Sequence, residues 1–184
     1  MVLNSDILPS QAIMERSSRS WAEHVQDTFD ELGYELPETF RRGRSLDIGC
    51  GTGYLTGYLQ YAGVDAYGID PDRRAIEYGI KHYNFRNPEK LFPASITHLP
   101  FEDETFFTVT SCHISDVVNG DIGTRIPFPS KEKPKASIEI YRVLERGGLY
   151  IAFDTDIAFD LPREMEFLYG YPRNHPVLRV WHKK

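Results

Sequence analysis

The fold of this chain is decided by the stretch Ser45-Leu46-Asp47-Ile48-Gly49-Cys50-Gly51-Thr52-Gly53-Tyr54-Leu55, which joins a short apolar strand to a helix. A glycine stands at every second position from Gly49 to Gly53. Glycine adopts backbone angles that are closed to other residues and lets a ligand lie directly against the main chain. The amides that open the following helix favour polar or anionic groups. The stretch therefore predicts a turn that holds a nucleotide-like ligand.

The spacing of the glycines separates two classes of nucleotide. A dinucleotide site has the pattern G-x-G-x-x-G, or a final alanine, which packs the helix on the strand and seats a pyrophosphate. That last position is Tyr54 when counted from Gly49 and Thr56 when counted from Gly51, so the dinucleotide pattern fails in both registers. What remains is D-x-G-x-G-x-G, with Asp47 two residues ahead of the first glycine.

A second acid follows this turn. The stretch 65–70 (DAYGID) is typical of a short strand that ends in a carboxylate, and Asp70 comes 17 residues after Gly53. An acid at such a strand end can accept both hydroxyls of a ribose, as in dinucleotide folds, where it comes about 20 residues on. We predict Asp70 to be the ribose ligand. The alternative is that Asp70 caps the helix that begins near Pro71, a role that Asp72 could also fill.

The pattern from Asp47 to Gly53 resembles the first motif of the class I methyltransferases, which bind S-adenosylmethionine. The resemblance implies that Asp47 and the turn hold the amino-acid end of this cofactor. It also places in the cofactor site the turn residues and three residues from other segments: Gly49, Cys50, Gly51, Gly53, Asp70, Pro71 and Ser111.

Two further stretches resemble the small-molecule branch of that family, which includes the ubiquinone and menaquinone methyltransferases. Residues 94–106 (ASITHLPFEDETF) are similar to G-D-A-x-x-L-P-F-x-D-x-x-F, and residues 139–148 (EIYRVLERGG) to E-x-x-R-V-L-K-P-G-G. In the family the aspartate of the first pattern takes the adenine amino group. Ser95 stands in its place as a weaker, uncharged acceptor, and Ile96 supplies the next backbone amide. The resemblance covers roughly residues 40 to 155.

Helix and strand patterns alternate along the chain. We expect strands at 44–49, 66–69, 91–96, 106–112 and 149–153, and helices at 11–33, 55–62, 73–83 and 133–145. This order predicts an α/β fold, with a doubly wound, mainly parallel sheet, helices on both faces and the ligand at the carboxyl ends of the strands. After residue 153 one strand is evident, at 177–181, so either the sheet is short by one strand or the chain is incomplete.

The composition fits one globular domain. The chain has 184 residues, of which 41% are hydrophobic and 26% charged; these values are ordinary for a folded domain with a core of its own. We expect a single methyltransferase-like domain, divided into a helical cap (1–40), a cofactor-binding core (41–155) and a short tail (156–184).

Charge and cysteine content exclude several classes of function. The net charge of −6 argues against a nucleic-acid partner, for which a basic stripe is expected. Cys50 and Cys112 form neither a disulfide framework nor a metal-ligand cluster, so we expect no metal and a reducing, cytoplasmic location. The first ten residues lack the pattern of a secretory signal, and no apolar run approaches the length of a membrane span, so we expect a soluble protein with no membrane partner.

The expected chemistry is transfer of a methyl group to a small-molecule acceptor by in-line displacement, for which orientation matters more than a dedicated side chain. No catalytic residue is therefore assigned. If the acceptor is a hydroxyl or a protonated amine, His113 is the natural candidate base, with Asp116 a weaker one; the plainer interpretation of His113 is a polar loop residue. The loop 119–135 is expected to cover or bind the acceptor.

Two alternatives stay open beside this function. A non-catalytic module would bind S-adenosylmethionine without turnover, which the serine at position 95 and the short tail would allow. A nicotinamide-dependent oxidoreductase would bind a dinucleotide instead, although Tyr54 and Thr56 disfavour it. The identity of the acceptor, the atom that is methylated and the oligomeric state do not follow from these motifs.

Overall fold

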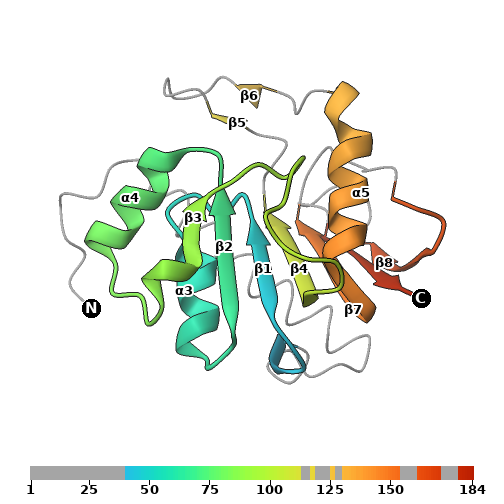
Figure 1. Cartoon of the computed structure of the whole chain (residues 1–184), viewed down its shortest axis with the longest axis horizontal. Helices are drawn as coiled ribbons and strands as arrows, with labels where there is room; N and C mark the ends of the chain where they lie inside the picture. Colours follow the sequence, from blue (N-terminus) through green and yellow to red (C-terminus); the bar gives the residue numbers. More distant parts are fainter. Residues whose placement is uncertain (1–39, 113–116, 119–124, 127–129, 154–160, 171–177) are drawn as a thin grey trace.

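The protein is built around one twisted sheet with helices on both faces (Figure 1). The computed structural model describes residues 40–112, 117–118, 125–126, 130–153, 161–170 and 178–184. Within these residues the sheet has seven strands in the order β3-β2-β1-β4-β7-β9-β8. The reversal of strand order beside β1 is the feature that places ligands at the carboxyl ends of parallel strands.

Five neighbouring strands run parallel, β9 runs antiparallel to them, and β8, at the edge beyond β9, runs in the same direction as the five. The parallel strands are β1 (Ser45–Ile48), β2 (Ala66–Asp70), β3 (Leu91–Pro93), β4 (Phe106–Cys112) and β7 (Leu144–Phe153). The strand β9 (Leu178–Lys183) pairs antiparallel with β7, and β8 (Met165–Gly170) pairs antiparallel with β9. A separate two-stranded hairpin consists of β5 (Val117–Val118) and β6 (Arg125–Ile126).

Helices cover both faces of the sheet, with α5 on one face and α3 on the other. They are α3 (Tyr54–Tyr61), α4 (Arg73–His82) and α5 (Lys133–Val143), with short 3-10 turns η1 (Pro88–Lys90) and η2 (Ser130–Glu132). Side chains alternate along a strand, so each strand supplies both faces. In β1, Leu46 and Ile48 pack in the cluster on the α5 side, whereas Asp47 points toward α3.

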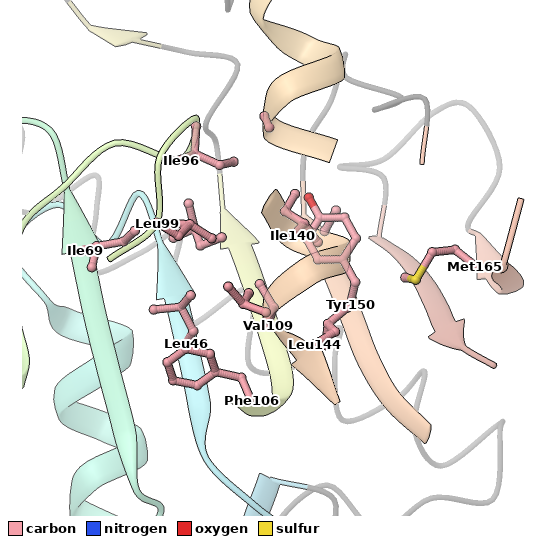
Figure 2. Packing of buried hydrophobic residues seen from close by; sticks show 14 residues of the cluster. Leu46, Ile69, Ile96, Leu99, Phe106, Val109, Ile140, Leu144, Tyr150 and Met165 are labelled. Carbon is pink, nitrogen blue, oxygen red and sulfur yellow. The ribbon is translucent and has the colours of Figure 1, made fainter. Parts of the chain in front are cut away.

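The core on the α5 side is the larger of the two (Figure 2). It brings Ile140 of α5 against Val109 and Tyr150 of the sheet, and all three side chains are fully buried. On the opposite face, Leu55 and Leu59 of α3 pack with Ile151 of β7. Burial at about 25 cal/mol per Å² of apolar surface makes these two layers the main source of stability.

The helix α5 also fastens the loop that follows β3. The Arg142 guanidinium donates to both carboxylate oxygens of Glu139, at 2.8 and 2.9 Å, and to the carbonyl oxygens of Phe101 (2.7 Å) and Leu99 (3.0 Å). The Glu139 carboxylate in turn accepts the Leu99 amide at 2.7 Å. The two stretches that resemble the small-molecule branch, 94–106 and 139–148, are therefore joined in space.

The predicted fold class is confirmed, and most element bounds agree within a few residues. The fourth strand has the predicted bounds, 106–112. The third ends at Pro93 rather than residue 96, because the chain turns at Ser95, whose carbonyl accepts the His98 amide at 3.1 Å. The strand β7 begins at Leu144, where the backbone becomes extended directly after α5 (φ −72°, ψ 134°).

The carboxyl-terminal part differs from the sequence pattern. One strand was expected after β7, at 177–181, and the structure has two: β9 near that position, and β8, which the pattern did not indicate. The segment of β8 (MEFLYG) lacks a regular alternation of apolar and polar residues, and its pairing with β9 shifts register between Phe167 and Tyr169. The predicted helix 11–33 lies outside the described residues.

Candidate cofactor site

The glycine turn between β1 and α3 forms the centre of the site. Gly49, Gly51 and Gly53 all have positive φ, at 72°, 56° and 82°, in the left-handed region that other residues rarely adopt. A Cβ atom at Gly53 would also collide with the side chain of Leu91 on β3. The turn therefore needs its glycines both for backbone conformation and, at Gly53, for close packing.

The backbone of the turn is held by the neighbouring strand. The amides of Gly49 and Cys50 donate to the Ile69 carbonyl at 2.8 and 3.0 Å, and the Gly53 amide donates to the Cys50 carbonyl at 2.8 Å. These amides are used inside the protein. The structure thus shows a turn that is fixed in advance and along which a ligand can lie against the main chain; the amides that the sequence offered to a ligand are those that open α3.

Asp70 ends β2 and reaches back to the turn. Its Oδ2 accepts the Gly51 amide at 2.9 Å, and its Oδ1 accepts the Asp72 amide at 2.8 Å. Burial raises the pKa of this carboxyl above its usual value, against the opposing effect of the two amides. Asp72, not Asp70, caps α4, since its carboxylate accepts the Arg74 amide at 2.9 Å. The capping alternative for Asp70 is therefore removed, and its position beside the turn suits a ribose.

Asp47 lies beneath the turn and is only 2% exposed. Its carboxylate accepts the hydroxyl of Thr56 at 3.0 Å and that of Thr110 at 3.2 Å. Burial raises the pKa of Asp47 to about 7, and the two hydroxyl hydrogen bonds only partly oppose this effect. In this structure the carboxylate ties α3 and β4 to β1, and its predicted contact with the cofactor stays a prediction.

The partners of Asp47 were not singled out in the sequence. Strand register places Gly68 of β2 and Thr110 of β4 directly beside Asp47. A Cβ atom at Gly68 would collide with the Thr56 hydroxyl, so Gly68 leaves the space in which Thr56 donates to Asp47. Thr56 occupies the position where a dinucleotide motif has its last glycine. That departure was the available signal, because a hydroxyl there can satisfy a buried acid.

The site has two carboxylates and no cation among the described residues. The ion pairs among the described residues involve other acids, and none of the lysines, arginines or histidines described pairs with Asp47 or Asp70. Cys50 is buried beside them, and burial together with both carboxylates raises the pKa of its thiol. An acidic surround of this kind suits a cationic ligand better than a pyrophosphate.

The predicted adenine contacts, Ser95 and Ile96, lie in the segment after β3. The Ala94 amide donates to the Asp70 carbonyl at 3.2 Å, which brings Ser95 and Ile96 close to the end of β2. Ser95 is exposed, and its hydroxyl lies 2.9 Å from that of Thr97; the Ile96 side chain is buried in the core, so any contact from it is through its backbone.

The last two predicted cofactor residues, Ser111 and Pro71, differ in exposure. Ser111 is fully buried, with its hydroxyl 2.8 Å from that of Tyr150, on the α5 side of the sheet. Pro71 is exposed between β2 and α4. The candidate base His113 and its alternative Asp116 lie outside the described residues, as does most of the loop 119–135. Within the described part of the chain, no group of three or more metal-ligating side chains is found.

Membrane insertion through a helix finds no support in the same residues. None of the helices described is both long enough and apolar enough to cross a bilayer.

The strand order and the acid-bearing glycine turn define a Rossmann-like domain of the methyltransferase type. Solved structures agree on the fold: the PH0226 protein of Pyrococcus horikoshii OT3 (TM-score 0.62, 17% identity, covering 89% of this chain and 91% of that one) and a TehB-like SAM-dependent methyltransferase of Corynebacterium glutamicum (TM-score 0.56, 17% identity, covering 91% and 98%). A putative methyltransferase bound to the Trm112 activator in Haloferax volcanii is also similar (TM-score 0.55, 13% identity, covering 91% and 96%).

The family itself follows from the sequence match. The model of the methyltransferase domain family matches residues 46–152, more than half of the 184 residues, so the chain belongs to that family. No curated protein sequence matches it. The protein is thus an S-adenosylmethionine-dependent methyltransferase, and a nicotinamide-dependent oxidoreductase does not account for this match. The likeness to the quinone branch stays a prediction.

Proposed function

We propose that this protein transfers the methyl group of S-adenosylmethionine to a small-molecule acceptor, with the cofactor held by the glycine turn, Asp70 and the segment after β3. The observation that carries the proposal is the pair Asp47 and Asp70 at a fixed glycine turn without a cationic partner among the described residues. S-adenosylmethionine carries a sulfonium, an ammonium and a carboxylate group and is therefore a net cation, whereas a dinucleotide brings the negative charge of its pyrophosphate.

Asp70 fits the ribose through its spare acceptor capacity. Each of its carboxylate oxygens accepts one backbone amide, at 2.9 and 2.8 Å. A carboxylate oxygen has about two acceptor sites, so each keeps one for a ribose hydroxyl. The two amides hold the carboxylate in place before the ligand arrives. The loss of side-chain entropy on binding is therefore smaller.

Ser95 and Ile96 complete the proposed adenine contacts. The Ser95 hydroxyl accepts the Thr97 amide at 3.3 Å and can still exchange a hydrogen bond with a ring amino group. The Ile96 side chain is anchored in the core, which fixes its backbone amide. These two residues lie after β3, next in the sheet to β2 and Asp70.

The bound cofactor supplies an electrophilic methyl group, and the protein supplies its alignment. In Figure 1 the hairpin β5–β6 lies beyond the carboxyl ends of β1, β2 and β4. The hairpin belongs to the insertion between β4 and α5, in which an acceptor-binding loop was predicted. We therefore assign the hairpin to the acceptor side, where exclusion of water and orientation favour in-line transfer.

The charge of the chain favours a small acceptor over nucleic acid. A net charge of −6 opposes binding to a phosphate backbone, to which basic proteins are drawn by release of counterions. The carboxyl groups of Asp47 and Asp70 beside the glycine turn also disfavour phosphate groups near the cofactor.

Calorimetric titration with S-adenosylmethionine, S-adenosylhomocysteine and NAD, side by side, tests the cofactor assignment. We expect both sulfur nucleotides to bind and NAD not to bind. Transfer of a labelled methyl group to a panel of small molecules, with RNA and DNA as parallel acceptors, then tests the acceptor class. Labelling of nucleic acid alone would contradict the small-molecule assignment, and binding of NAD alone would contradict the cofactor.

A further inference from the structure

We propose that Asp47 is a positioning residue that gives up a proton when S-adenosylmethionine binds, so that cofactor binding and ionisation of this buried carboxyl are coupled. The inference rests on the proposed placement of the cofactor at the glycine turn. It concerns a residue that lies under the turn and contributes to binding through α3 and β4.

The geometry leaves the Asp47 carboxylate poorly compensated when it is charged. It is 2% exposed, and its donors, two hydroxyls and the Thr56 backbone amide, are all neutral. One of them, Thr110, lies 3.3 Å from the Leu46 carbonyl as well as 3.2 Å from Asp47, so a single hydroxyl hydrogen is shared between two acceptors. A buried carboxylate that has only neutral donors holds its proton to near-neutral pH.

Within the part of the chain that the structure describes, the groups that face Asp47 from the surrounding elements add no positive charge. From α3 it meets Thr56, from β4 Thr110, and from β2 Gly68, none of which is ionisable near neutral pH. The ionisable neighbours are Asp70 at the end of β2 and the Cys50 thiol in the turn. Ionisation of Asp70 further opposes ionisation of Asp47, since like charges disfavour each other.

A cationic ligand changes this balance in one direction. Because Asp47 is already buried, binding cannot desolvate it appreciably further, and the new influence is attraction by the positive charge brought to the turn. Attraction by a cation favours the carboxylate and lowers the pKa of Asp47. The proton then passes from the Asp47 carboxyl to the buffer, and no covalent bond of the ligand changes.

The coupling gives binding a defined pH dependence. At a pH below the pKa that Asp47 has in the cofactor-free protein, binding of one cofactor molecule releases up to one proton. The affinity for the cofactor therefore rises with pH by at most about tenfold per pH unit. Above about pH 8, Asp47 is already ionised and its contribution to the slope vanishes. A neutral nucleoside such as 5′-methylthioadenosine brings no charge and should release no proton from Asp47.

The test is calorimetric titration of the intact chain with S-adenosylmethionine at several pH values, each in two buffers that differ in enthalpy of protonation. The Asp47→Asn variant places a neutral amide where the protonated acid was, and Asp72→Asn makes the same change at an exposed helix cap as a matched control. The amino group of the ligand contributes equally in all proteins, so differences between them report Asp47. The Asp70→Asn variant shows whether the released proton comes from Asp70 instead of Asp47.

The expected result is proton release in the wild type, Asp72→Asn and Asp70→Asn proteins near neutral pH, and its loss in Asp47→Asn. Binding with no proton release in the wild type, or release that persists in Asp47→Asn and disappears in Asp70→Asn, would overturn the inference and leave the cofactor assignment intact. Absence of binding at every pH would overturn both.

A second measurement covers the case in which Asp47→Asn does not fold. Carbon-13 NMR of the aspartate carboxyl groups in the wild-type protein should show a resonance that titrates near neutral pH and moves to lower pH with S-adenosylmethionine, but not with 5′-methylthioadenosine. Resonances that all titrate below about pH 5, with or without ligand, would contradict the inference.

Discussion

Two acidic clusters in this protein differ in whether a cation accompanies them. At the loop clamp, which consists of Glu139 and Arg142 of α5 with the loop 99–105, the arginine holds the pKa of Glu139 below its usual value. At the glycine turn, Asp47 and Asp70 lack such a partner among the described residues, and burial raises the pKa of both.

The difference separates a structural use of acids from a ligand-binding one. The loop clamp is complete in itself, because Arg142 also donates to Leu99, Phe101 and Asp103, so that both carboxylates of the clamp, Glu139 and Asp103, have a cationic partner. The turn has negative charge that a cationic ligand can compensate. Carboxyl groups whose pKa values are strongly shifted are found more often at functional sites. At the glycine turn the pKa values are raised because the carboxyl groups are buried without a cation from the described part of the chain, an arrangement that the loop clamp does not have.

The largest expected effect concerns Asp47 and pH. Its pKa is about 7 in the folded protein, against about 3.9 in an unfolded chain, so the unfolded chain loses its proton first as pH rises. The free energy of unfolding should therefore fall by up to about 4 kcal/mol between pH 4 and pH 7, relative to Asp47→Asn. Denaturant unfolding of both proteins across this range measures it, and parallel profiles would contradict the assigned burial.

The next effect is loss of the cation at the loop clamp. Arg142→Met leaves the Glu139 carboxylate without its main partner and two carbonyls without a donor, so we expect unfolding to become easier by about 3 kcal/mol. The estimate is below that for a fully buried pair, because the Arg142 side chain is 26% exposed. Thermal unfolding checks it. A change below about 0.5 kcal/mol would show that the clamp contributes little.

A third effect lies in cofactor binding at Asp70. Asp70→Ala removes a charged acceptor for the ribose together with the anchor of the Gly51 amide, so affinity for S-adenosylmethionine should fall by about 1.5 to 3 kcal/mol, or roughly 10- to 150-fold. Calorimetry measures the affinity, and circular dichroism shows whether the variant is folded. A folded variant with unchanged affinity would remove Asp70 from the site.

Glu139 offers the opposite pH dependence to Asp47. Because its folded pKa is lowered, it contributes stability that is present above the unfolded pKa and is lost as pH falls through the folded value. Relative to Glu139→Gln, the wild type should lose about 1 to 2 kcal/mol of its advantage on acidification below about pH 4.5. If the wild type instead became more stable relative to Glu139→Gln on acidification, the lowered pKa of Glu139 would be contradicted, and with it the difference between the two clusters.

The smallest effect is expected at Arg146, which serves as a control for Arg142. Its side chain is 83% exposed and lies 3.6 Å from Glu104. An exposed pair of this kind contributes little, so Arg146→Met should change the free energy of unfolding by less than about 0.5 kcal/mol. A loss comparable to that of Arg142→Met would mean that charge alone, not the set of hydrogen bonds, explains the clamp.

The site was foreseen in part from local patterns. Asp70 and the glycines lie in one continuous turn-and-strand arrangement, and their spacing was enough to bring them together. Thr56, Thr110 and Gly68 were missed because they meet Asp47 through strand register and helix packing, over separations of 9 to 63 residues. Ser111 was expected at the cofactor, yet its hydroxyl pairs with Tyr150, a partner 39 residues away.

The sequence by itself determined the order of the five parallel strands and of the helices between them, the glycine turn and the family, because each depends on residues close together in the chain. Only the tertiary structure decided which charges are compensated. Arg142 reaches Glu139 and the loop after β3 at once, whereas the turn encloses Asp47 among hydroxyls. Electrostatic energies depend on distance and burial in space, and neither quantity can be read from the order of residues alone.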